Sequence, residues 1–309
     1  MSHEVETMFY AGREKPWHGL GTQVATALTS ADAITQAGLD WTVVQRPVIV
    51  DNREVPNFVA NVRETDGNVL GIVSDRYQIV QNAEAFSFTD NLIGNDVRYD
   101  TAGSLRNGKT IWLLAKMPST SILGDAIDPY LVFTNSHDGF GAIKVALSPI
   151  RVVCNNTLNL ALSSASRSWT TKHIGNIEAK LSEARRTLEL ANDYMSALNN
   201  KADELANSPI KLGEVETFIS ELFPLEEDAS DRKKETAKKI KDAIMICYFS
   251  PDIKKFMNTK YGVINAISDW CGHAEPSRAT ADYKANNWNR IMNGHPVLDR
   301  ALTLLTASK

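Results

Sequence analysis

The order of apolar and polar residues predicts β-strands across the first half of the chain. The run 41–50 is mostly apolar and β-branched, and residues 58–62 alternate between apolar and polar, as half-buried strands require. Asp66-Gly67 lies between this second segment and a further apolar run at 69–73. Because an Asp-Gly dipeptide between two strands favours a tight turn, the sequence predicts a β-hairpin here.

The strand pattern continues to about residue 170 and is interrupted by two helical segments. Ser30 is a predicted cap for a short helix that ends at Gly38, and Asn82 for a second helix that ends at Gly94. Further strands are predicted at 97–101, 109–116, 130–135, 142–147 and, after an interruption at Ser148-Pro149, at 150–154. We expect residues 41–170 to form one twisted, mainly antiparallel sheet with packed helices.

The pattern becomes helical near Asn176. From Ile177 to Leu205, apolar residues recur at spacings of three, four or seven, which predicts an amphipathic helix of about thirty residues that Pro209 ends. Shorter helical patterns follow at 215–223, 232–248, 264–270, 287–292 and 298–305. The predicted fold class is α+β. The predicted domains are an α+β domain with a long hairpin at 1–175, a long helix at 176–208 and a helical domain at 209–309.

Composition and charge narrow the class of protein. The chain has 309 residues, with 33 Lys and Arg against 37 Asp and Glu, and its net charge of −4 excludes nucleic-acid binding through bulk basicity. No apolar run approaches the roughly 18 to 20 residues of a membrane span, and the polar N-terminus lacks a signal-peptide pattern. Cys154, Cys247 and Cys271 are far apart in sequence, which is typical of thiols in a reducing compartment. We expect a cytoplasmic protein without cofactor or metal, since no zinc-ligand spacing is present.

The most informative feature is the absence of acidic residues from 139 to 177. At the average acidic content of the chain, these 39 positions would carry about five Asp and Glu residues, yet they carry none. The basic residues of this segment are interleaved with amides, hydroxyls and one tryptophan. The candidate site residues are Lys144, Arg151, Asn155, Asn156, Arg167, Trp169, Lys172 and His173.

The composition of this segment allows two interpretations. Basic side chains neutralise phosphates, amides and hydroxyls donate hydrogen bonds to them, and Trp169 could stack on a base, so the segment is a candidate nucleic-acid interface. A pair of buried strands followed by a serine-rich loop would also lack acids. Burial accounts well for 142–162 and poorly for 163–173, so the sequence leaves both interpretations open.

A second basic cluster lies at 232–241, directly after acidic residues at 226–231. Lys234 and Lys238 are one helical turn apart, so a solvated helix face with charge pairs at turn spacing accounts for the cluster. An auxiliary contact to phosphate is the alternative.

Two histidines form a further candidate site. His18 and His137 both lie in glycine-flanked turns, and Asp138 follows the second. Such residues could ligate a metal or act as a base and its orienting group. No third ligand stands at a diagnostic spacing, and the chain has no nucleophile elbow, P-loop or dinucleotide fingerprint. The sequence therefore assigns no catalytic residue.

Four segments carry a resemblance to a known family, namely 16–22 (PWHGLGT), 75–80 (DRYQIV), 134–139 (TNSHDG) and 148–158 (SPIRVVCNNTL). Through them, most of the chain resembles the phage- and plasmid-like "LGT" family within the domain of unknown function 932. The resemblance implies a mobile-element origin and a host bacterial cytoplasm, and it implies no particular activity.

The expected architecture is also similar to that of the phage single-strand annealing proteins of the Red-beta, Erf and Sak type. In those proteins a helix packs on a sheet with a long hairpin, and rings of subunits hold DNA in a basic groove. The corresponding elements here would be the helix from Asn82 to Ile93, the strands at 130–162 and the long helix from Ile177.

The leading hypothesis is a phage-encoded, non-catalytic protein that binds or anneals single-stranded DNA. Self-association would add avidity to modest contacts made by each subunit. One alternative is an interaction protein that sequesters a host defence factor or an anionic nucleotide ligand, through a pocket lined by His18, His137 and Arg151. The other is a nuclease or hydrolase that uses His137 and Asp138.

Overall fold

The fold consists of two compact units. The structure is a computed structural model that describes residues 5–11, 22–24, 29–92, 98–151, 156–157, 160, 162, 168–273 and 294–307. Unit 1 comprises 1–118, 129–147 and 167–191, and unit 2 comprises 119–128, 148–166 and 192–309. Helix α3 (Ile177–Ala206) continues from unit 1 into unit 2. The mixture of helices and antiparallel strands confirms the α+β class.

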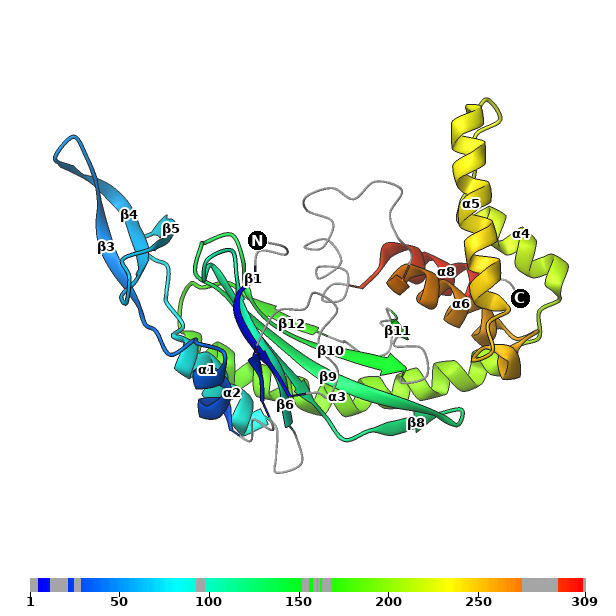
Figure 1. The fold of residues 1–309 in the computed structure, drawn as a ribbon, viewed down its shortest axis with the longest axis horizontal. Helices are drawn as coiled ribbons and strands as arrows, with labels where there is room; N and C mark the ends of the chain where they lie inside the picture. The colour runs from blue at the N-terminus through cyan, green and yellow to red at the C-terminus, as the bar shows by residue number, and fades with distance from the viewer. Residues whose placement is uncertain are drawn as a thin grey trace. The chain divides into compact units, whose positions relative to one another are not determined.

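Among the described residues, unit 1 contains two separate sheets, two short helices and the first part of α3 (Figure 1). Its elements are β1 (Val5–Tyr10), β2 (Thr22–Gln23), α1 (Ser30–Gln36), β3 (Val43–Val50), β4 (Arg53–Arg63), β5 (Val69–Ser74), α2 (Asn82–Leu92), β6 (Arg98–Leu105), β7 (Thr110–Lys116), most of β9 (Asp125–Ser136), the first part of β10 (Ile143–Arg151) and β12 (Ser168–Thr171). The main sheet has the order β10-β9-β7-β6-β1-β2, and β12 pairs with β10. The second sheet has the order β3-β4-β5.

The expectation of one sheet across 41–170 is wrong, because β3, β4 and β5 pair only with one another among the described strands. Tight turns join β3 to β4 and β4 to β5, so each strand forms its backbone hydrogen bonds with a neighbour in sequence. Hydrophobic alternation identifies strands but does not specify which sheet they join. The β3–β4 hairpin extends beyond the end of β5 (Figure 1), since β5 pairs with β4 only from Phe58 to Val62.

Several element boundaries differ from the predicted ones. The cap of α1 is Thr29 rather than Ser30, because the Thr29 hydroxyl accepts a hydrogen bond from the Asp32 amide at 3.1 Å. The helix ends as expected before Gly38, which has a φ of +64°. Strand β10 runs through Ser148-Pro149 without the predicted interruption.

The core of unit 1 lies between the main sheet and the helices α1 and α2. Alternate residues of the central strands point into it, including Ile111 and Leu113 of β7 and Phe133 of β9. Ala33 of α1 and Phe86 of α2 pack against them. Residues of β7 and β9 that lie between these positions face the opposite side, which we call the outer face of the main sheet.

The three-stranded sheet contacts the turn at 136–141 through a close backbone approach. A Cβ atom on Gly71 of β5 would lie 2.6 Å from the Cα and carbonyl oxygen of Asp138. On either side of this contact, Asn61 Nδ2 donates to the His137 carbonyl at 2.8 Å, and Tyr77 Oη donates to the Ser136 carbonyl at 2.5 Å. The turn is therefore held by backbone packing and by two side-chain hydrogen bonds.

Replacing Gly71 with alanine is expected to lower the free energy of unfolding by about 1 to 3 kcal/mol, because the added methyl group meets backbone atoms that cannot rotate away. Urea unfolding of the full chain measures this. Gly213→Ala is the matched control, since no heavy atom lies within 4 Å of its added Cβ, and it should leave stability unchanged or slightly raised. Equal stability of the two variants would contradict the close approach.

Unit 2 is mainly helical. Its elements are β8 (Thr120–Ile122), which pairs with the start of β9, β11 (Asn156–Thr157), which pairs with the end of β10, α4 (Leu212–Leu222), α5 (Asp231–Tyr248), η2 (Lys254–Phe256), α6 (Lys260–His273) and α8 (Pro296–Ala307). The predicted segment 287–292 lies outside the described residues. In the described part of the chain, neither Cys247 nor Cys271 forms a disulfide. Among the helices that the structure describes, none combines the length and apolar character needed to cross a membrane.

Candidate nucleic-acid interface

The pairing of β10 with β12 divides the acid-free segment between two faces of the main sheet. Val145 is fully buried in the core and pairs with Trp169, so both side chains lie on the core side of the sheet. Lys144 pairs with Thr170, and these two residues lie on the outer face. Lys144 is half-buried, whereas Thr170 and the following Lys172 are exposed. We call Lys144, Thr170 and Lys172 the basic strip.

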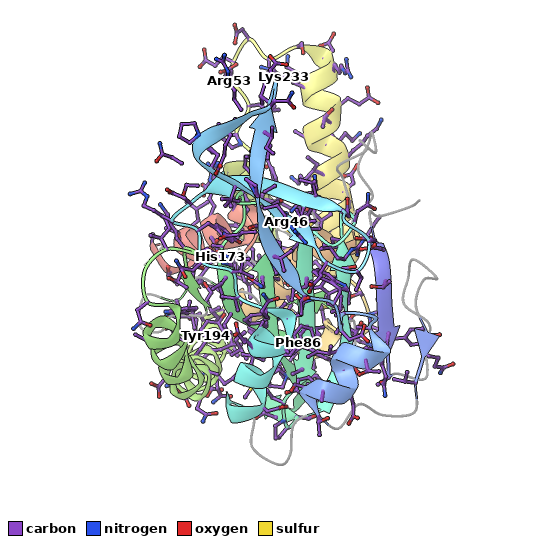
Figure 2. The ribbon with its side chains drawn as sticks, turned by 90° about the vertical axis from the view of Figure 1, so that its left-hand side faces the viewer. Arg46, Arg53, Phe86, His173, Tyr194 and Lys233 are labelled. Carbon is purple, nitrogen blue, oxygen red and sulfur yellow. The ribbon has the colours of Figure 1, made fainter. Side chains whose placement is uncertain are left out.

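Two of the predicted contact residues have structural roles in the core. Trp169 packs against the hydrophobic core of unit 1, so it is not placed to stack on a base on the outer face. His173 is only 3% exposed, and its ring stacks on Tyr77 with a centroid distance of 4.6 Å. Figure 2 labels His173 among the densely packed side chains of the unit, well below Arg53 at the end of the β3–β4 hairpin. We therefore remove Trp169 and His173 from the predicted interface.

The remaining predicted residues are only partly described. Arg151 and Asn156 are described only as a cross-strand backbone pair between β10 and β11. Asn155 and Arg167 lie outside the described residues, as does His18. The basic strip is consequently the part of the predicted interface whose position is established.

The outer face also carries residues that the sequence analysis did not select. Lys116 of β7 pairs with Tyr130 of β9, and Trp112 pairs with Thr134. Tyr130, Thr134 and Lys116 are half-buried, whereas Trp112 is only 6% exposed. Strand alternation with Ile111 and Leu113 could have placed Lys116 on this face. The position of Tyr130 depends on the register between two strands, which the sequence pattern does not specify.

His137 and Asp138 are both buried, at 0% and 3% exposure. The Asp138 carboxylate accepts hydrogen bonds from Ser136 Oγ at 2.5 Å and from the amides of Phe140 at 2.9 Å and Gly141 at 3.3 Å. It also forms an ion pair with Arg106 at 3.2 Å. All these contacts organise the turn at 136–141, so they favour a structural role for Asp138.

The hydrogen bonds of Asn82 determine which nitrogen of His137 carries the proton. Asn82 Nδ2 donates to the carbonyls of Leu39 and Trp41, so its Oδ1 atom is the acceptor for His137 Nε2 at 3.0 Å. His137 Nδ1 is then unprotonated, and it has no hydrogen-bond partner among the described residues. The ring packs edge-on against Trp41 at a centroid distance of 5.6 Å.

The environment of His137 keeps its ring neutral. Burial, together with the nearby His173, lowers the pKa of His137 to about 3, although the Asp138 carboxylate acts in the opposite direction. Burial and the Asp138 charge raise the pKa of the Tyr77 hydroxyl, which stays protonated and donates to Ser136. A neutral, enclosed imidazole is well suited to packing and poorly placed to meet a substrate from solution.

No metal centre is formed by the residues that the structure describes, since no three His, Cys, Asp or Glu side chains gather closely enough to hold an ion. The predicted anionic-ligand pocket of His18, His137 and Arg151 has one described side chain, His137, and it is fully buried. The described geometry therefore provides no support for a hydrolase or for a ligand pocket at these residues.

Together, the observations define an α+β protein with a basic strip on its main sheet and a buried polar network beneath its three-stranded sheet. The chain belongs to the family described as Domain of unknown function (DUF932), whose sequence profile matches residues 69–292. This match confirms the resemblance to the domain of unknown function 932, and three of the four segments that carry the resemblance lie inside the matched range. A search of curated proteins found no match, and a search of solved structures found none either. The likeness to single-strand annealing proteins stays a prediction.

Proposed function

We propose that this protein binds single-stranded nucleic acid on the outer face of its main sheet, without cleaving it. The observation that carries the proposal is the orientation of the basic strip. The pair Lys144–Thr170 faces away from the core while the neighbouring pair Val145–Trp169 faces into it. Part of this face is buried, since Val132 and Ala146 are each 1% exposed. Burial alone would account for the missing acids there, but it does not account for the exposed Thr170 beside Lys144.

The chemistry of this face suits a phosphate backbone. Lys116, Lys144 and Lys172 supply ammonium groups, and Thr170 supplies a hydroxyl donor. Tyr130 is the aromatic residue on this face that could stack on a base, in place of Trp169. The described cross-strand pairs on this face contain no carboxylate, and Asp100 of β6 lies at a bulge between two of them.

The other predicted contacts remain part of the proposal. Arg151, Asn155, Asn156 and Arg167 belong to the same acid-free segment as the basic strip, and they would extend the phosphate contacts beyond it. Annealing would follow if the sheet holds a strand extended with its bases accessible to a complementary strand. Self-association would then raise the affinity of modest contacts through avidity.

The experiment is fluorescence anisotropy with a labelled single-stranded oligonucleotide across a salt series. We expect binding at 50 mM salt that weakens as salt rises, and a Lys144→Gln/Lys172→Gln protein that binds at least tenfold more weakly. Each lost phosphate contact should also reduce the magnitude of the log–log salt slope by about 0.7. Binding that is absent at 50 mM salt, or that does not respond to salt, would contradict the proposal.

The control variant is Lys239→Gln. Lys239 is an exposed lysine of α5 that pairs with Glu235 at 2.8 Å, and it lies outside the outer face. Its loss should leave both the affinity and the salt slope unchanged. An equal effect of Lys239→Gln and of the double variant would show that binding follows net charge rather than the basic strip.

A further inference from the structure

Two apolar side chains are exposed at the tip of the β3–β4 hairpin. Ile49 is 62% exposed and Val50 is 57% exposed. They immediately precede the turn residues Asp51 and Asn52, whose φ angles of 50° and 59° are those of a tight hairpin turn. The tip lies beyond β5, so each strand is paired there only with the other strand of the hairpin (Figure 1). Neighbouring exposed apolar residues at the end of an extended arm are typical of a contact surface.

Unit 2 has an open groove with an apolar floor. The groove has a volume of about 550 Å³ and lies between the end of α4, the following loop, α5 and α8. Its apolar lining includes Leu222, Phe223, Leu225 and Ile240. Leu225 is 47% exposed, so the groove presents apolar surface to solvent.

The groove and the hairpin tip carry opposite charge. Arg232, Lys233 and Arg300 line the groove together with one carboxylate, Glu226, which pairs with Lys233 at 3.5 Å. Arg300 donates to the Glu221 carbonyl at 3.4 Å, and no carboxylate is its hydrogen-bond partner in that contact. The groove thus has an excess of positive charge.

At the hairpin tip, Asp51 and Glu54 are exposed acids and Arg53 is the one base, so residues 51–54 have a net negative charge. Figure 2 shows Arg53 at the end of the hairpin, with Arg46 farther along it. The tip therefore combines apolar side chains with acids, and the groove combines an apolar floor with bases.

We propose that the hairpin tip of one copy of this protein docks in the α4–α5–α8 groove of a second copy. Ile49, which shares a face of the hairpin with its cross-strand partner Glu54, would cover the apolar floor, and Asp51 and Glu54 would approach Arg232 and Arg300. A second copy is the occupant because both complementary surfaces belong to the same chain. The inference goes beyond the proposed function and does not depend on it, since the contact involves no residue of the basic strip.

This contact is heterologous: each copy offers one tip and one groove, and the two are different surfaces. Such a contact joins copies head to tail, so it produces a closed ring or an open chain rather than a symmetric dimer. A hairpin tip is a small contact, and small contacts are weak individually. The assembly should therefore depend on protein concentration and on salt.

Light scattering after size-exclusion chromatography tests the proposal on the full chain without nucleic acid. The wild type is expected to form multimers whose mass rises with concentration. A tip variant, Ile49→Lys, and a groove variant, Arg232→Glu, should each be monomeric, because each places like charges in the contact. Both positions are exposed, so circular dichroism spectra should match that of the wild type.

Mixing the two variants gives the decisive result. One partner keeps an intact groove and the other an intact tip, so an equimolar mixture should regain the association that neither variant shows alone. Ile246→Lys, at a 75% exposed position on α5 outside the groove, is the control that should assemble like the wild type. A monomeric wild type, a monomeric mixture, or assembly that survives Arg232→Glu would each overturn the proposal.

Discussion

Lowering the pH from 7 to 4 is expected to cost this protein about 3 kcal/mol of folding stability through His137 alone. The pKa of His137 in the folded state is about 3, well below the value near 6.5 of an unfolded chain. When folding lowers the pKa of a histidine, the folded state binds the proton less readily than the unfolded state. The folded state is therefore not penalised at any pH above the pKa of the unfolded chain. Stability is lost as the pH falls from there toward the folded-state pKa, at up to about 1.4 kcal/mol per pH unit for one proton.

The physical cause is the closed environment of the ring. His137 is fully buried, its Nε2–H donates to Asn82, and Trp41 and His173 lie close to it. A proton added at Nδ1 would create a buried charge, opposed by His173 and favoured only by Asp138. The unfolded chain binds that proton readily in water, so acidification favours unfolding.

Urea unfolding at pH 7, 6, 5 and 4 measures this effect, and His137→Gln separates it from the titration of carboxylates. The variant retains an amide that can donate to Asn82 and does not titrate. It should be less stable than the wild type at pH 7 but lose stability more slowly between pH 6.5 and 4. If the two proteins lose stability in parallel, another group accounts for the acid sensitivity.

Replacing Asp138 with alanine should lower the free energy of unfolding by about 3 kcal/mol. The carboxylate accepts a hydrogen bond from the buried Ser136 hydroxyl, and a buried donor that loses its partner costs about 1 to 3 kcal/mol. It also accepts from the amides of Phe140 and Gly141, but both residues are exposed, so water can replace these two contacts and they should add less. Arg106 is 43% exposed, so water can solvate its charge and its loss as a partner should contribute little.

Thermal and urea unfolding of Asp138→Ala, Asp138→Asn and Asp75→Ala provide the comparison. Asparagine retains one acceptor oxygen, so Asp138→Asn should fall between alanine and the wild type. Asp75 is an exposed acid close to the same sheet, and its removal should change stability by less than about 0.5 kcal/mol. A loss below about 1 kcal/mol for Asp138→Ala would show that the turn at 136–141 does not depend on this carboxylate.

Much of the secondary structure follows from local sequence. The apolar spacing from Ile177 to Leu205 correctly predicts α3, because a helix repeats its buried face at a fixed period whatever it packs against. The turn chemistry of Asp66-Gly67 is also local, and Gly67 has a φ of +72° there. Sheet membership is not local, which explains why the separate sheet at 43–74 was missed.

In the candidate site, too, some properties follow from local sequence and others depend on the tertiary structure. The missing acids of 139–177 are visible in the sequence, and they correctly point to a strand that carries Lys144. The faces of that strand follow from its pairing with β12, which sends Trp169 into the core. His137 and Asp138 were selected for their chemistry, but burial among Asn82, Trp41 and Arg106 gives them structural roles.

The sequence by itself determined the α+β class, the family motifs, most helices and strands, and the extent of the acid-free segment from 139 to 177. These properties depend on periodicity, turn residues and charge, which neighbouring positions along the chain decide. The tertiary structure decided which side chains of that segment face outward, which strands leave the main sheet as an arm, and which polar groups are buried. Those properties depend on cross-strand register and on packing between residues such as Gly71 and Asp138, which lie far apart in sequence.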